Sequence, residues 1–200
     1  MKFFAKIMAI GALVFTSLVV SAVSNPYEVA NGIAKQAFAD LKANADKLTD
    51  QKVVLDIINK DLLPYVDVKY AAYKVIGTSL DKTSKEEREE FASAFGDYMM
   101  RSMSNAIGKY TNQELTESPV QEVAADATIV PVKYVLTDPG KADINFVVKM
   151  RLNKKTGEWK AFDLIAENIS ILDAKNAELG PIIRDKGIKE AIKALKASKE

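Results

Sequence analysis

The sequence predicts an α+β fold, an antiparallel sheet of about four strands whose one apolar face is covered by helices. From Asn25 to Tyr110, apolar residues recur every three or four positions, which is typical of amphipathic helices. After Tyr110 they alternate with polar residues, which is typical of strands with one buried face. Short turns join the alternating segments, so neighbouring strands should run antiparallel.

Three helices are expected in the first part of the chain, and each has a recognisable start. Asn25 precedes a proline and can cap the first helix. Asp50 can cap the second, which Pro64 should end. Asp67 can cap the third, and Gly77 is suited to its C-terminal end because glycine readily adopts a positive φ.

A fourth, longer helix begins after Ser84. Ser84 and Glu87 have the spacing of a capping box, and the acidic residues that follow lie where the helix dipole favours them. A long apolar stripe at helical spacing then comprises Phe91, Phe95, Tyr98, Met99, Met103, Ile107 and Tyr110.

The strands are predicted from residue 115 onward. Alternation is clearest where Phe146, Val148 and Met150 take one side and Lys149 and Arg151 take the other. The expected strands cover residues 130–136, 144–152 and 159–164, with a weaker strand near 115–123, and helices over 172–185 and 188–197 follow.

The N-terminal residues have the three parts of a secretory signal. Lys2 and Lys6 precede an apolar run, and small residues follow it at a cleavage position after Ser24. The run is shorter than the roughly 20 residues that a membrane-spanning helix needs. We therefore expect residues 1–24 to be a cleaved signal peptide and residues 25–200 to form a single exported, soluble domain. Cleavage would change the net charge from +1 to −1.

Composition excludes several function classes. The chain contains no His and no Cys, which rules out a Ser-His-Asp triad, a cysteine nucleophile and a His/Cys metal site. The balance of 28 basic and 27 acidic residues does not favour nucleic-acid binding. No metal-ligand or phosphate-loop spacing is present, so we expect no metal and no cofactor.

Asp163 and Glu167 are the acids late in the expected sheet that apolar residues flank closely. A carboxylate pair could perform acid–base chemistry in a hydrolase or isomerase. The alternative is that one of them is salt-bridged and the other exposed, which is common in folds.

Large, adaptable apolar side chains from the sheet and the fourth helix are directed to one place. Methionine is flexible and suits surfaces that fit variable ligands, and helices over an open sheet can leave a cavity. Patterning alone does not distinguish a filled core from a pocket.

Several segments resemble the toluene-tolerance (MlaC) family of periplasmic phospholipid carriers. The sequence DLLPYVDVKYA over residues 61–71 and VIG over 75–77 resemble its signature. TIVPV over 128–132 and GEWKAFDLIAE over 157–167 resemble its strands, and RDKGI over 184–188 its terminal helix junction. The similarity covers nearly all of residues 25–197.

The resemblance implies an NTF2-like fold, with helices over a curved sheet enclosing an apolar cavity for acyl chains, and no enzymatic activity. It implies a monomer that carries phospholipid between an outer-membrane lipoprotein–porin complex and the MCE-domain protein of an inner-membrane ABC transporter, which maintains outer-membrane lipid asymmetry. Together with the apolar patterning, it gives a set of candidate lipid-binding residues: Val68, Val75, Ile76, Met99, Met103, Ile107, Val132, Tyr134, Phe146, Val148, Phe162, Leu164 and Ile169. A carboxylate-based hydrolase or isomerase and a ligand-free periplasmic adaptor are the alternatives.

Overall fold

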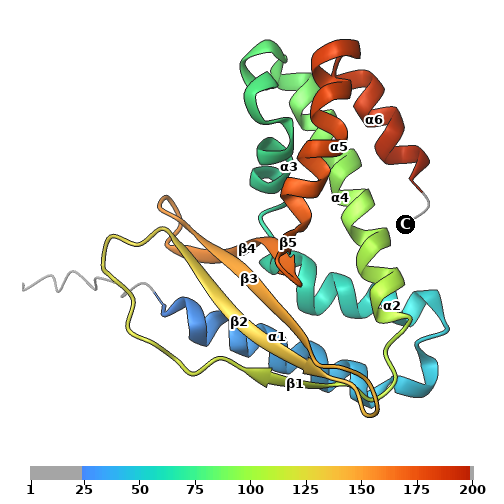
Figure 1. Cartoon of the computed structure of the whole chain (residues 1–200), viewed down its shortest axis with the longest axis vertical. Helices are drawn as coiled ribbons and strands as arrows, with labels where there is room; N and C mark the ends of the chain where they lie inside the picture. The colour runs from blue at the N-terminus through green and yellow to red at the C-terminus, as the bar shows by residue number, and fades with distance from the viewer. Residues whose placement is uncertain (1–23, 199–200) are drawn as a thin grey trace, which may run out of the picture.

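A five-stranded antiparallel sheet is combined with six α-helices in residues 24–198, the part of the chain that the computed structural model describes (Figure 1). The strands are β1 (Glu114–Glu117), β2 (Ile129–Thr137), β3 (Ile144–Asn153), β4 (Glu158–Ala166) and β5 (Ile169–Ser170), in the order β1-β2-β3-β4-β5. The α+β class is confirmed, with one strand more than about four. The predicted signal segment lies outside the described residues except for its last position.

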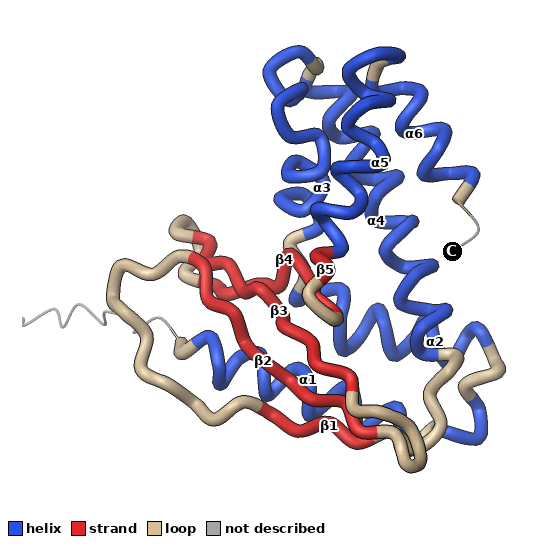
Figure 2. The backbone as a smooth tube through the Cα atoms, in the orientation of Figure 1, coloured by secondary structure: helices blue, strands red, loops and turns tan. Residues whose placement is uncertain are grey.

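Five of the six helices lie in two places (Figure 2). Helix α1 lies along one face of the sheet, whereas α3, α4, α5 and α6 pack together beyond its β4–β5 edge. Helix α2 packs between the C-terminal ends of α1 and α4. The helices are α1 (Pro26–Ala43), α2 (Gln51–Ile57), α3 (Val68–Ile76), α4 (Lys85–Ile107), α5 (Ile171–Lys186) and α6 (Ile188–Ala197). Short helical turns over Ala45–Lys47, Ile58–Leu62, Leu63–Tyr65 and Gly77–Lys82 connect them.

The predicted helix starts are confirmed at atomic detail. The Asn25 and Asp67 side chains accept hydrogen bonds from the backbone N–H groups of Tyr27 and Tyr70, and the capping box at Ser84 is complete. Gly77 ends α3 with a φ of +57°, and a Cβ there would lie 2.9 Å from the amide nitrogen of Asn176. The backbone conformation therefore favours glycine at this position, and a side chain there would also displace the Asn176 amide.

The second helix was predicted to end at Pro64. Its α-helical part ends at Ile57, and it continues as a π-helical turn over Ile58–Leu62, just before Pro64. The expected strand near 115–123 is also shorter, since β1 ends at Glu117. Tyr110 lies beyond the end of α4 and packs edge-on against Phe38 of α1.

The sheet register places the apolar side chains on the face toward α1. Val132 pairs with Val148, which pairs with Leu164. Between Lys149 and Met150 the register shifts, because β4 contains one extra residue there. That residue is Phe162, which packs edge-on against Tyr70 of α3 at 5.1 Å between ring centroids.

The segment that resembles the family signature joins the helices to the sheet. Val66 forms a parallel bridge with Ala161, and the Asp67 backbone N–H donates to the Ala161 carbonyl at 2.8 Å. The Asp67 carboxylate also pairs with Arg151 of β3 at 2.6 Å, and the Arg151 guanidinium lies over the Tyr70 ring. One aspartate thus caps α3 and fixes it to the sheet.

Candidate functional site

An apolar cavity of about 900 Å³ lies between α1, the apolar face of the sheet, the second half of α4 and the beginning of α5. Its deepest walls include Tyr134, Met150 and Phe95, which are almost fully buried. Most of its exposed lining residues lie in two places, on β5 and the first turns of α5, and at the C-terminal end of α4 with Lys109 just beyond it. Tyr65 in the turn Leu63–Tyr65 is an exposed lining residue as well. The mouth therefore lies between these two edges.

Small side chains on α1 leave the space open. The face of α1 toward the sheet carries Ala30, Ala34 and Ala37, with Ile33 and Phe38 beside them, and all five line the cavity. Ala30 packs with Tyr27 against the sheet core, so the helix stays close to the strands at its N-terminal end. Farther along, methyl groups do not fill the distance between helix and sheet, and the space remains between the layers.

Eight of the predicted lipid-binding residues line this cavity: Met99, Met103, Tyr134, Phe146, Val148, Phe162, Leu164 and Ile169. They come from α4, β2, β3, β4 and β5, so the topology brings them together from distant parts of the chain. Their contact with lipid stays a prediction.

The other five predicted residues lie elsewhere. Val75 and Ile76 are buried in the core between α3, α4, α5 and α6, and Val68 packs against that core. Val132 is buried with the residues that hold α1 to the sheet, and Ile107 with the residues between α1 and α2. In the structure these five side chains pack against protein outside the cavity, and their contact with lipid also stays a prediction.

The residues of α1 that line the cavity form its α1 wall, and none of them was among the predicted lipid-binding residues. The apolar spacing along residues 26–43 indicated a helix, but it did not indicate which neighbour the helix would face. The signal that could have identified it is the run of alanines at helical spacing, Ala30, Ala34 and Ala37, on a helix otherwise able to carry larger residues.

An ion pair joins the C-terminal end of α1 to the π-helical turn that follows α2. The Asp40 carboxylate accepts a hydrogen bond from Lys60 at 2.5 Å, and this interaction, with a second one to Asp61, holds the pKa of Asp40 below its usual range. Asp61 is itself buried in the π-helical turn, and burial, followed by the neighbouring Asp40, raises its pKa. One Asp61 oxygen has no hydrogen-bond partner among the described residues.

A few polar groups lie in the otherwise apolar lining. The Tyr134 hydroxyl donates to the Asn31 side chain of α1 at 3.0 Å, and burial strongly raises the pKa of Tyr134. The other charged, amide and serine side chains of the lining lie toward α4 and the start of α5: Ser102, Asn105, Lys109, Asp163, Lys175 and Glu178. The cavity thus has an apolar end under α1 and a polar side between α4 and α5.

Asp163 and Glu167 do not form a catalytic pair. Asp163 is buried and accepts hydrogen bonds from Lys149 at 2.9 Å, Ser170 at 2.8 Å and the Leu172 backbone N–H at 3.2 Å. Glu167 is exposed at a turn and accepts a hydrogen bond from the Asn145 backbone N–H. The carboxylate of Asp163 therefore fastens β4 to β3 and to the start of α5.

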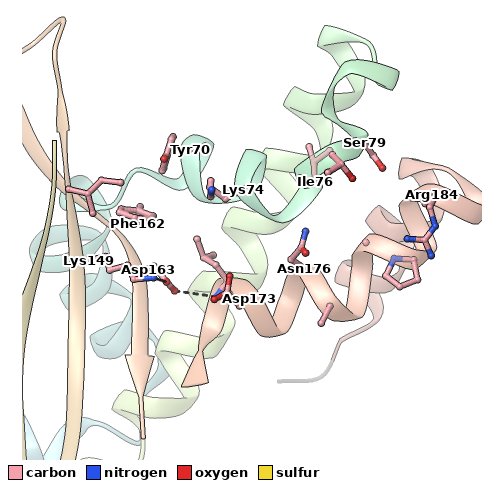
Figure 3. Close-up of a pocket in the computed structure, with 17 residues that line it drawn as sticks. Tyr70, Lys74, Ile76, Ser79, Lys149, Phe162, Asp163, Asp173, Asn176 and Arg184 are labelled. Carbon is pink, nitrogen blue, oxygen red and sulfur yellow. Dashed lines mark hydrogen bonds and ion pairs between the residues drawn. The ribbon is translucent and has the colours of Figure 1, made fainter. Parts of the chain in front are cut away.

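A second, more polar cleft of about 610 Å³ lies on the other side of Phe162, between α3 and α5 (Figure 3). Tyr70 and Lys74 lie on one side of it, and Asn176 and Arg184 of α5 on the other. The Asn176 amide donates to the Val75 carbonyl at 2.7 Å and so bridges the two helices. This cleft shares Phe162, Asp163 and Leu172 with the apolar cavity as a common wall.

Within residues 24–198, no three carboxylate-bearing side chains are grouped so that they could hold a metal ion. None of the helices described is both long and apolar enough to cross a membrane.

Comparison with known proteins finds relatives along almost the whole chain. The family model described as MlaC protein matches residues 31–197. An intermembrane phospholipid transport system binding protein, MlaC of Haemophilus influenzae, is 30% identical over 176 residues, which cover 88% of this chain and 82% of that protein. Toluene tolerance protein Ttg2D of Pseudomonas putida is 27% identical over 156 residues, or 77% of this chain and 71% of that protein.

A solved structure has the same fold. It is a phospholipid-binding protein from Ralstonia solanacearum in complex with a phospholipid, with a TM-score of 0.76 at 16% identity, and the match covers 86% of this chain and 96% of that chain. The family model covers the signature segment, the sheet and all the cavity-lining residues of α1 except Ala30. The chain belongs to the MlaC family.

Proposed function

We propose that this protein is a periplasmic phospholipid carrier that shields acyl chains in the cavity under α1. The observation that carries the proposal is the apolar cavity of about 900 Å³ with a mouth between α4 and α5. This volume falls in the range of small-molecule binding sites, and its lining is mostly hydrophobic, as such sites are. The relatives named for phospholipid transport and phospholipid binding support the same assignment.

A carrier is needed because lipid does not cross water unaided at a useful rate. Two acyl chains contain on the order of 30 methylenes, and exposing each costs about 0.8 kcal/mol. The total is roughly 24 kcal/mol, which the protein avoids by surrounding the chains. Met99 and Met103 line the wall with flexible side chains, which suits a pocket that must also release its ligand.

The proposed route is between an inner-membrane ABC transporter with an MCE-domain protein and an outer-membrane lipoprotein–porin complex. We propose further that residues 1–24 are a signal peptide, that residues 25–200 form the mature monomeric carrier, and that it serves outer-membrane lipid asymmetry. With a net charge of −1 after cleavage, the carrier has no broad attraction to anionic membranes, so docking depends on specific protein partners.

Catalysis is not part of the proposal. A general acid or base must be able to reach a substrate proton, whereas the Asp163 oxygens already accept three hydrogen bonds. The adaptor alternative is disfavoured because an adaptor has no need of an open apolar cavity.

A vesicle-transfer assay tests the function. Donor vesicles with radiolabelled phosphatidylethanolamine and unlabelled acceptor vesicles are mixed with the mature chain, and transfer is expected to rise in proportion to protein concentration. Ala34→Trp places an indole inside the cavity and should remove most of the transfer, whereas Ala39→Trp, the same change on the exposed side of α1, should not. Transfer that is absent, or equally lowered by both changes, would contradict the carrier function.

A further inference from the structure

Lys175 is a buried cation in the wall of the apolar cavity. It lies on α5, is only 6% exposed, and contributes to the cavity lining. Its ammonium group lies 4.4 Å from the centroid of the Tyr98 ring and 2.8 Å from a carboxylate oxygen of Glu178. Lysine is rarely buried, and a buried ammonium beside a hydrophobic ligand site calls for a physical reason.

The ion pair with Glu178 does not by itself supply that reason. A lysine and a glutamate three residues apart on a helix normally pair at the surface, as Lys193 and Glu190 do, where the side chains are 72% and 44% exposed. In the Lys175 pair, the lysine side chain is 8% exposed and the glutamate 53%. The cation is therefore turned inward, and its partner stays in contact with solvent.

The protein keeps this ammonium charged. Burial alone would lower the pKa of Lys175, but hydrogen bonds with Glu178 and Tyr98 outweigh that effect and raise the pKa above its ordinary value. A positive charge is thus available in the cavity wall at every physiological pH.

The same lining contains a polar group that, unlike Lys175, has no hydrogen-bond partner among the described residues. The Ser102 hydroxyl is buried and makes no hydrogen bond within the described part of the chain. Ser102 lies one helical turn beyond Tyr98 on α4, and both residues line the cavity. Buried hydroxyls are normally satisfied, so an unsatisfied one at a ligand site indicates a group that the ligand completes.

We infer that Lys175 and Ser102 form the subsite for the phosphate diester of the bound glycerophospholipid. The inference rests on the proposed function and adds the orientation of the lipid and the chemical group that is recognised. An ammonium and a hydroxyl can both donate hydrogen bonds to the oxygens of a phosphate. The bond from the ammonium is charge-assisted, and such bonds are stronger than those between neutral groups. When phosphate binds, the half-exposed Glu178 turns into solvent and gives up its place to the anion.

This arrangement orients the lipid. The phosphate lies between α4 and α5, the acyl chains extend under α1 toward Tyr134 and Met150, and the remainder of the headgroup faces the mouth. The subsite binds the phosphate and makes no contact with the alcohol that is esterified to it. Phosphatidylglycerol and phosphatidylethanolamine should therefore load alike, and diacylglycerol, which has the same chains without phosphate, should load poorly.

The test is competitive loading. Delipidated protein is incubated with vesicles containing equal amounts of dioleoyl phosphatidylglycerol, dioleoyl phosphatidylethanolamine and dioleoylglycerol, and the bound species are counted by native mass spectrometry. The wild-type protein should favour each phospholipid over the diacylglycerol, and Lys175→Met should reduce that preference about tenfold. Lys193→Met removes the lysine of a comparable helix pair outside the cavity and should leave the preference as it is.

Glu178→Gln separates recognition from structure. If the Lys175–Glu178 pair only stabilised α5, this change would lower the preference as Lys175→Met does. Under the inference it keeps the ammonium, removes its competitor, and preserves or raises the preference for phospholipid. Ser102→Ala should lower the preference, by less than Lys175→Met.

The outcomes distinguish this inference from the proposed function. A protein that loads all three lipids equally well, with the Lys175→Met variant indistinguishable from it, remains a carrier of acyl chains, and the phosphate subsite is refuted. A wild-type protein that loads none of the three refutes the carrier function itself.

Discussion

Placing a carboxylate in the cavity wall gives a prediction whose magnitude can be worked out. Val148 lies on β3, pairs with Val132 and Leu164, and lines the cavity, whereas the next residue, Val147, faces the opposite side of the sheet. In Val148→Glu, the apo protein can hydrate the new carboxylate because the cavity has an open mouth. A bound lipid removes that water and leaves the charge against methylenes.

The carboxyl escapes this cost by taking up a proton. An ordinary glutamic acid has a pKa of about 4.3, so protonating it costs about 3.7 kcal/mol at pH 7 and about 1 kcal/mol at pH 5. Since a raised pKa in the lipid-bound state favours binding only below that pKa, lipid retention must recover as the pH falls. We expect Val148→Glu to hold phospholipid about 500-fold more weakly than Val148→Gln at pH 7, and about fivefold more weakly at pH 5.

The assay is retention of radiolabelled phospholipid by equilibrium dialysis against vesicles at the two pH values, with folding checked by urea unfolding. Val148→Gln is the reference because it is equally polar and does not titrate. Val147→Glu is the matched control on the other face and should retain lipid at both pH values. Equal retention by the Glu and Gln variants of Val148 at pH 7 would refute the reasoning, as would an equal loss in Val147→Glu.

Three further predictions concern the framework around the cavity, each measured as a free energy of unfolding in urea. Asp163→Asn should lower it by about 2 kcal/mol, because Lys149 loses its carboxylate partner, while phospholipid stays bound; loss of lipid with unchanged stability would contradict the structural role of Asp163. Asp61→Asn should remove a loss of stability that begins as the pH rises above about 4, the ordinary pKa of an aspartate, because a group with a raised folded-state pKa loses its stabilising contribution as the pH rises toward that pKa. An unchanged pH dependence would contradict the burial of the Asp61 charge beside Asp40. Tyr134→Phe should cost about 1 kcal/mol through its lost hydrogen bond to α1, and no loss would mean that the bond does not hold the helix.

The parts of the fold that depend on local sequence could be predicted. Asn25, Asp67 and Ser84 act as caps through bonds to N–H groups two or three residues away, so their roles are visible in the sequence. The alternation in residues 144–152 likewise predicted which side chains of β3 face the core. Neighbouring side chains on a strand face opposite ways, so this property too depends only on local sequence.

The cavity depends on contacts between distant segments, and there the sequence was less informative. An apolar stripe looks the same whether it faces another helix, as at Val75, or an open space, as at Met103. The extra residue in β4 that turns Phe162 toward α3 leaves no mark on the alternation. Lys175 was not identified either, since its burial results from the packing of α5 against α4, nearly eighty positions away in the sequence at Tyr98.

Native mass spectrometry of the chain, exported in bacteria and purified without detergent, shows directly whether the cavity holds lipid. We expect the main species to carry glycerophospholipid that fragmentation identifies, and we expect Ala34→Trp to lower the lipid-bound fraction while Ala39→Trp preserves it. A folded protein found only as the bare chain, even after incubation with phospholipid vesicles, would contradict the claim that the cavity is a lipid site.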